Sequence, residues 1–243
     1  GAPLTGPAFG GDGNGLFAAL MFTPRSMDLM NLPYQSPIDG RNVYYRRGST
    51  IQNPRWVLNN SGQSEKLNRF FSSTGLSYDI TDNISVLYRL SLDNYNQTNV
   101  RHINKGGAQV PDGEMRTFNI RQTTVDHVFH VNFNFQLNQA LSLSGVVGAN
   151  PRTEEFVETG TLSTQQFVFN LKSHDNFINH DSYSFITQET TVGAFVTATL
   201  GFNDYLYLNL QGRNDWTSTL EKENRSIFYP SASVSFLASE AIP

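Results

Sequence analysis

Histidine and carboxylate side chains are the first candidates for chemistry in this sequence, because both can bind metals and transfer protons. His127 and His130 lie three positions apart in a run that alternates like a β-strand, so they point to opposite faces and share no metal. Asp215, Glu221 and Glu223 show no spacing that defines a catalytic pair and fit structural hydrogen bonds or ion pairs better. We therefore predict no catalytic site, no metal site, no cofactor and no enzymatic activity.

Ligand contact is a second kind of chemistry, and one segment near the N-terminus has suitable residues for it. Arginine and aromatic side chains can stack on sugars or contact an anionic partner. The alternative is a solvated loop without a ligand, because exposed charges are usual on protein surfaces. The candidate loop contacts are Tyr44, Tyr45, Arg46, Arg47 and Trp56.

The clearest structural pattern is in the segment from Tyr205 to Asn214, where apolar residues recur at every second position. Such alternation predicts a β-strand with one apolar and one polar face. Its length suits a tilted strand that crosses a lipid bilayer, which takes about 9 to 11 residues. Aromatic residues are enriched at the membrane interface, and Trp216 at the end of this strand is predicted to lie there. The candidate lipid-facing residues are Leu206, Leu208, Leu210 and Trp216.

The same alternation recurs along the chain and predicts about seven strands. The polar faces of these strands would face a barrel interior, where they would line a substrate path, contact a plug or keep the interior hydrated. The candidate residues of that interior are Arg89, Asp93, Asn132, Asn209 and Arg213. The alternating segments lie at 76–80, 84–92, 127–137, 141–147, 192–200, 206–216 and 232–236.

The connections between these strands are predicted to alternate between short turns and long polar stretches. Turn residues at 81–83, 138–140 and 203–204 close three hairpins, whereas a polar stretch of roughly 30 residues follows the first hairpin and another runs over 150–188. Short periplasmic turns and long extracellular loops are typical of outer-membrane barrels. Residues 67–243 are accordingly predicted to be membrane-crossing strands with such connections.

Residues 1–66 are less regular, and we interpret them as one strand joined to a long extracellular loop. The apolar run from Leu16 to Phe22 can also be a short buried helix, which periodicity does not exclude. An open sheet of seven strands leaves unpaired backbone groups at its edges, which lipid does not tolerate. The predicted fold is therefore all-β: an antiparallel transmembrane β-barrel of which this chain supplies one part.

Composition sets the remaining limits. The net charge of -4 gives no general attraction to nucleic acid, and the absence of cysteine excludes disulfides and thiolate metal sites. Only 16% of the residues are charged, and no apolar run approaches the 18 or so residues of a membrane helix. A barrel remains compatible, because alternating strands average to a low hydropathy.

Specific sequence blocks then resemble a known family. The segment from Gly212 to Leu220, its continuation from Glu223 to Ser231, and the shorter segments Asp204 to Leu208 and Pro24 to Leu29 are similar to the SusC/RagA family. Its members are TonB-dependent outer-membrane transporters of Bacteroidetes. The resemblance implies a central section of a plugged barrel with roughly 22 strands.

The same resemblance implies a function and partners. Family members import a bulky nutrient such as an oligosaccharide or a peptide, a SusD-like surface lipoprotein captures it, and TonB acts through a plug domain. Neither the plug nor a TonB box is identifiable in this chain. The alternatives are a SusC-like barrel that serves as a structural or interaction subunit of another envelope complex, and a soluble carbohydrate-binding β domain.

Overall fold

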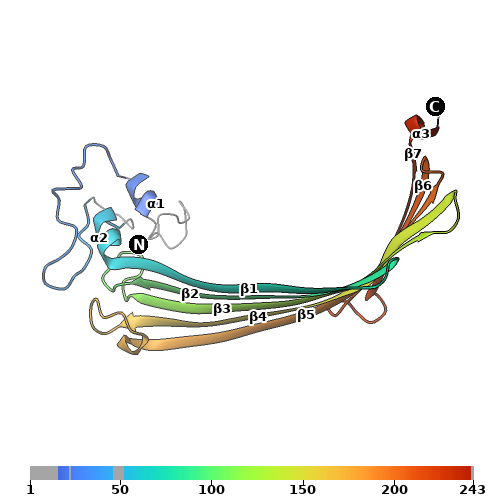
Figure 1. Cartoon of the computed structure of the whole chain (residues 1–243). Helices are drawn as coiled ribbons and strands as arrows, with labels where there is room; N and C mark the ends of the chain where they lie inside the picture. Colours follow the sequence, from blue (N-terminus) through green and yellow to red (C-terminus); the bar gives the residue numbers. More distant parts are fainter. Residues whose placement is uncertain (1–15, 22, 46–51, 242–243) are drawn as a thin grey trace. The chain divides into compact units, whose positions relative to one another are not determined.

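The computed structural model describes residues 16–21, 23–45 and 52–241 and shows an antiparallel seven-stranded sheet. Each strand neighbours the strands that precede and follow it in the chain, and within the described residues the order ends at β1 and β7 without closure (Figure 1). This confirms the predicted all-β fold and the strand number. The strands are β1 (Ser61–Thr81), β2 (Ile84–Ile103), β3 (Glu114–Gln136), β4 (Leu141–Gln166), β5 (Phe177–Phe202), β6 (Leu206–Thr217) and β7 (Ser226–Phe236).

Residue contacts divide the chain into two compact units. Unit 1 comprises residues 1–68, 96–120 and 157–185, and unit 2 comprises residues 69–95, 121–156 and 186–243. Unit 1 holds the helices α1 (Leu16–Met21) and α2 (Pro54–Asn60) and the short 3-10 helix η1 (His174–Asn176), and unit 2 ends in α3 (Ala238–Ala241). Among the described residues, no helix is both long and apolar enough to cross a membrane.

The predicted hairpin turns of unit 2 are confirmed between β1 and β2, between β3 and β4, and between β5 and β6. The last of these turns uses Asn203 and Asp204, which have φ angles of 48° and 58°. Two consecutive residues with positive φ match the tight hairpin turn whose twist fits the flanking strands, and Asn and Asp tolerate that conformation better than most residues. The turn therefore fixes the register of β5 against β6.

The predicted long loops are wrong in extent. The stretch 150–188 belongs mostly to β4 and β5, each of which has 26 residues, and the connection between them is confined to 167–176. The connection between β2 and β3 is likewise only 104–113. Outside the segments with one apolar face, both faces of a strand carry polar residues. The alternation of apolar and polar residues then disappears, although the backbone hydrogen bonds between the strands continue. These two connections of unit 1 are still longer than the tight turns of unit 2.

Unit 1 has a small core around α2. Asn53 caps this helix by accepting a hydrogen bond from the Arg55 amide, and Pro54 occupies its first turn. The core side chains are Tyr45, Trp56, Val57, Ile103, Met115 and Phe177.

The irregular segment predicted for residues 1–66 is interrupted by both helices and by the start of β1 at Ser61. For the apolar run from Leu16, the helical alternative is confirmed over Leu16–Met21, whereas Phe22 lies outside the described residues. At Leu20 and Met21 the expectation of burial is wrong, because both side chains are exposed.

Candidate functional site

The strand β6 in unit 2 has the two distinct faces that its sequence predicts. Leu208 lies directly opposite Leu200 of β5 and Val234 of β7, and directly opposite residues of an antiparallel pair share a face. Leu206 and Leu210 continue this apolar row, and Trp216 lies on the same face beyond Gly212 and Asn214, opposite Val192 and Ser226. The four candidate lipid-facing residues therefore share one face, and each has more than a third of its surface exposed.

The opposite face of β6 is polar. Asn209 lies between Thr199 and Ser233, and its side-chain oxygen accepts a hydrogen bond of 2.7 Å from the Thr199 hydroxyl. Gln211 lies between Thr197 and Ser231. A row of hydroxyl and amide groups suits water and a polar solute, whereas it would be costly against hydrocarbon.

Arg213 is held on this polar face by two neighbours. Its guanidinium forms an ion pair with Asp215 at 2.7 Å and donates to the side-chain oxygen of Asn150 at 3.0 Å. Gly193 lies opposite Asp215, and a Cβ at this position would lie 2.6 Å from the Asn150 oxygen and 2.7 Å from an Asp215 carboxylate oxygen. The cluster of Arg213, Asp215 and Asn150 thus requires a glycine in β5.

Gly193→Ala is expected to destabilise the barrel by about 1 to 3 kcal/mol, because the added methyl group overpacks this cluster. The midpoint of the heat-induced mobility shift of the full-length protein in gel electrophoresis would measure the effect. Gly75→Ala in β1 is the matched control, since its nearest neighbour is the Tyr88 carbonyl oxygen at 3.8 Å. Equal midpoints for the two variants would contradict the assigned role of Gly193.

The other candidate interior residues also share a face. The Asn132 amide donates to the Ser85 hydroxyl at 3.1 Å, which places Asn132 on the same side as Ser85. Arg89 and Asp93 follow Ser85 at intervals of four in β2, so they project to that side as well. Asp93 accepts two hydrogen bonds from Arg69, at 2.9 and 2.6 Å. The structure therefore brings Arg89, Asp93 and Asn132 together on one face.

The candidate loop contacts of unit 1 are only partly available to a ligand. Tyr44 is 56% exposed, whereas Tyr45 is buried with its hydroxyl 3.0 Å from the Thr23 hydroxyl. Trp56 has no exposed surface, and its indole nitrogen donates to the Gly40 carbonyl at 2.9 Å. The contact role predicted for Trp56 and Tyr45 is therefore wrong in this conformation, because both side chains form the core. Arg46 and Arg47 lie outside the described residues.

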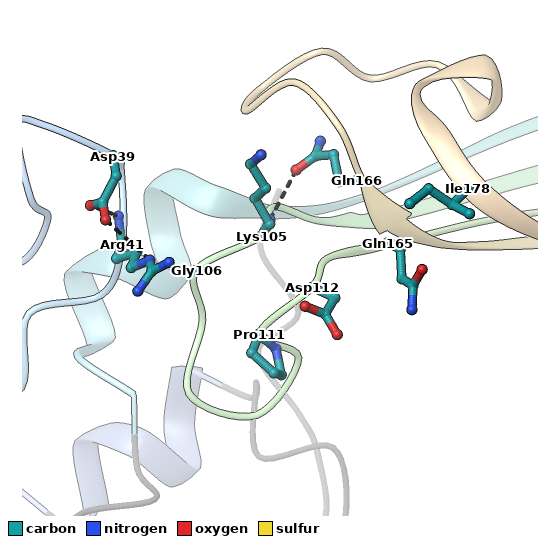
Figure 2. A pocket seen from close by; sticks show the side chains of 9 residues that line it. All are labelled: Asp39, Arg41, Lys105, Gly106, Pro111, Asp112, Gln165, Gln166 and Ile178. Atoms are coloured by element: carbon teal, nitrogen blue, oxygen red, sulfur yellow. Dashed lines mark hydrogen bonds and ion pairs between the residues drawn. The ribbon is translucent and has the colours of Figure 1, made fainter.

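Figure 2 shows a pocket in unit 1 that the sequence did not reveal. Its volume is about 400 Å³, and the Lys105 backbone amide at its rim donates to the Gln166 side chain at 2.9 Å. Arg41 forms an ion pair with Asp39 at 3.1 Å, and both side chains are well exposed. The lining residues are Asp39, Arg41, Lys105, Gly106, Pro111, Asp112, Gln165, Gln166 and Ile178.

A chain of side-chain amides fastens the connections around this pocket. Gln166 donates to Asn104 at 3.3 Å, Asn104 donates to Asn60 at 3.1 Å, and Asn60 donates to Gln35 at 3.0 Å. Asn104 is 1% exposed and Asn60 is 2% exposed. Buried amides require such partners, so these contacts fasten the connection after β2 and the end of β4 to α2. Amide residues spaced this far apart in the sequence give no signal of their proximity.

The histidines of unit 1 also pack into the structure. The buried Ser163 hydroxyl lies 2.7 Å from Nδ1 of His174 and 2.8 Å from Nδ1 of His180. Burial is the main cause that lowers the pKa of His174, followed by the charge of His180. Across the described part of the chain, no group of three or more histidine or carboxylate side chains could hold a metal ion.

His102 gives unit 1 a pH-dependent stability. Burial lowers its pKa from 6.5 to about 4, and the charge of Lys172 acts in the same direction. Its ring covers Gly62, where a Cβ would collide with it. Because the folded state favours the neutral imidazole, this stabilising contribution is complete above pH 6.5 and is lost as the pH falls towards 4.

We expect backbone amides of unit 1 to lose hydrogen-exchange protection over that pH range. His102→Asn should remove most of the pH dependence, and Lys172→Gln should reduce it, because loss of the lysine charge raises the pKa of His102 towards its ordinary value and so narrows the gap between the folded and unfolded states. Unchanged pH dependence in His102→Asn would assign the effect to another group.

A two-faced sheet whose apolar row and polar row each continue across three strands defines the chain as part of a barrel wall. Residues 13–242 match the family of TonB dependent receptor-like β-barrels, and the chain belongs to that family. The family is a class of Gram-negative outer-membrane proteins, and it consists of receptor barrels rather than enzymes. No curated protein matches the sequence.

Solved structures support the same fold. The RagAB peptide transporter is 16% identical to this chain with a TM-score of 0.73, over 80% of this chain and 22% of that chain. The RagAB peptide importer in the open-open state is 17% identical with a TM-score of 0.72, over 82% and 23% of the two chains. This chain thus spans less than a quarter of the length of the chains that it matches in these structures. The likeness agrees with the SusC/RagA resemblance predicted from the sequence.

Proposed function

We propose that this chain forms part of the wall of a SusC-like barrel that imports a bulky nutrient, an oligosaccharide or a peptide, across the outer membrane of a Bacteroidetes bacterium. A SusD-like surface lipoprotein would capture the nutrient. Energy would come from TonB through a plug domain. The family membership and the two-faced sheet support this proposal.

The observation that carries the proposal is the register of β6 between β5 and β7. Apolar residues at 206, 208 and 210 lie opposite apolar residues on both sides, and polar residues at 209 and 211 lie opposite hydroxyl residues on both sides. A wall between hydrocarbon and water needs this separation. The apolar face would contact lipid, and the polar face would line the route of the nutrient.

Strand length supports an outer binding region. β6 has 12 residues and β7 has 11, close to the length that crosses a bilayer, whereas β4 and β5 have 26 residues each. The excess strand residues belong to unit 1, together with the pocket and the amide chain. We assign unit 1 to the extracellular side, where it would contact the lipoprotein or its cargo.

Growth and uptake assays with the full-length protein test the proposal. Deleting the barrel gene, the gene for TonB, or the gene for a lipoprotein that co-purifies with the barrel should each abolish uptake of one oligosaccharide or peptide nutrient. Normal uptake without TonB, combined with a stable complex that lacks a SusD-like subunit, would refute import. That outcome would favour the alternative role as a structural or interaction subunit of another envelope complex.

A further inference from the structure

An exposed aromatic side chain in unit 1 packs against a glycine of the neighbouring strand. A Cβ added to Gly160 of β4 would lie 2.5 Å from Cζ and 2.7 Å from the hydroxyl oxygen of Tyr183 in β5. The ring therefore occupies the space that a side chain at 160 would fill. Tyr183 is nevertheless 47% exposed, so the backbone supports the ring on one side while much of its surface remains open.

A hydrogen bond fixes the orientation of this ring. The Tyr183 hydroxyl donates to Oε1 of Glu158 at 2.6 Å, a short bond to a charged acceptor. This bond is the main cause that raises the pKa of Tyr183, followed by burial. The hydroxyl is therefore a stable donor at neutral pH, and the second oxygen of Glu158 adds acceptor capacity beside the ring.

Further residues extend this surface along β5. Phe185 lies two positions after Tyr183, so it projects to the same face, and it is 58% exposed. Asp181 and Asn179 precede Tyr183 on that face, and Asn179 donates to the Thr164 hydroxyl at 3.5 Å. We call Asn179, Asp181, Tyr183, Phe185 and Glu158 the Tyr183 strip.

The chemistry of the Tyr183 strip fits a sugar ring. One side of a pyranose consists of C–H groups that pack on an aromatic face, and its rim carries hydroxyl groups that donate hydrogen bonds. Carboxylates only accept hydrogen bonds, and amides both donate and accept, so Glu158, Asp181 and Asn179 complement such a rim. A peptide backbone needs donors and acceptors in equal number. The strip is therefore better matched to a hydroxyl-rich ligand.

We propose that the Tyr183 strip is a binding subsite for the sugar rings of an oligosaccharide, with Tyr183 as the stacking platform and Glu158 as its positioning residue and hydroxyl acceptor. The inference rests on the proposed function, because it names the nutrient class of the same barrel. A purely structural reading is that Tyr183 covers a weak glycine position in the sheet. That reading predicts a loss of stability and no change in ligand binding.

Binding measurements on the full-length barrel in complex with its lipoprotein distinguish these readings. The probes are an array of α- and β-linked glucans, mannans, xylans and galactans, and a casein digest as the peptide probe. We expect the unmodified complex to bind at least one glycan. Tyr183→Ala should weaken that binding about tenfold, a change of the size expected for an aromatic contact.

Three further variants complete the test. Tyr183→Phe keeps the ring and loses the bond to Glu158, so it should weaken binding less than Tyr183→Ala does. Gly160→Ala displaces the ring and should resemble Tyr183→Ala. Val168→Ala, which truncates an exposed apolar side chain elsewhere in unit 1, should bind like the unmodified complex. The heat-induced mobility shift would verify that each variant is folded.

The outcomes separate this inference from the proposed function. Binding of casein peptides without binding of any glycan on the array overturns the inference, as does unchanged glycan affinity in a folded Tyr183→Ala variant. Import of a peptide nutrient would then still uphold the proposed function. Conversely, glycan binding that depends on Tyr183, without TonB-dependent uptake, would uphold the subsite and refute import.

Discussion

Replacing Trp56 with alanine is expected to open unit 1 locally around α2. The indole is completely buried and donates a hydrogen bond to Gly40, so the substitution leaves both a cavity and a carbonyl without its donor. Truncation of a buried aromatic residue costs about 3 to 5 kcal/mol. Hydrogen exchange of the backbone amides at 52–60, measured in the full-length protein, should show a loss of protection of this order.

Leu58→Ala is the control for this prediction, because Leu58 belongs to the same seven-residue helix but is 53% exposed. Its protection should change little. Proteinase K applied to intact cells gives an independent measurement, since cleavage in this segment should accelerate only in Trp56→Ala. Normal protection in Trp56→Ala, together with weaker ligand binding, would restore the contact role predicted from the sequence.

The difference between prediction and structure at Trp56 has a local cause. An aromatic residue near several arginines suggests a ligand surface, and a helix of seven residues is too short to show a clear helical period. Asn53 and Pro54 were the available signal, because a capping residue followed by proline marks the start of a helix. A helix at this point turns Trp56 inward towards Gly40.

The strands can be predicted from the sequence where their two faces meet different environments. Leu206 to Leu210 alternate with polar residues because lipid and water require different side chains, and the register confirms the resulting faces. Tyr183 and Glu158 lie in strand segments without that asymmetry, and for this reason the sequence predicts a loop where the structure has β4 and β5. The hydrogen bond between Tyr183 and Glu158 depends on how β5 is aligned with β4, and the residues near either position do not predict that alignment.

The assignment of the apolar face to lipid leads to a second large expected effect. Leu210 lies near the middle of β6, opposite Ala198 and Ala232. Leu210→Arg would place a charge near the centre of the bilayer, at a cost of about 2 to 4 kcal/mol. The amount of heat-modifiable full-length barrel in the outer-membrane fraction should therefore fall strongly.

Gln211→Arg is a control one residue away, on the opposite face of the same strand, between Thr197 and Ser231. A charge on this side would enter the hydrated interior, so barrel assembly should remain near the unmodified level. The two variants introduce the same side chain into the same strand at nearly the same depth, and they differ only in the face of the sheet that carries it. If Gln211→Arg abolishes assembly while Leu210→Arg is tolerated, the two faces are reversed, and Asn209 and Arg213 would no longer be candidates for the nutrient route. If both variants assemble normally, β6 does not cross the bilayer at this depth.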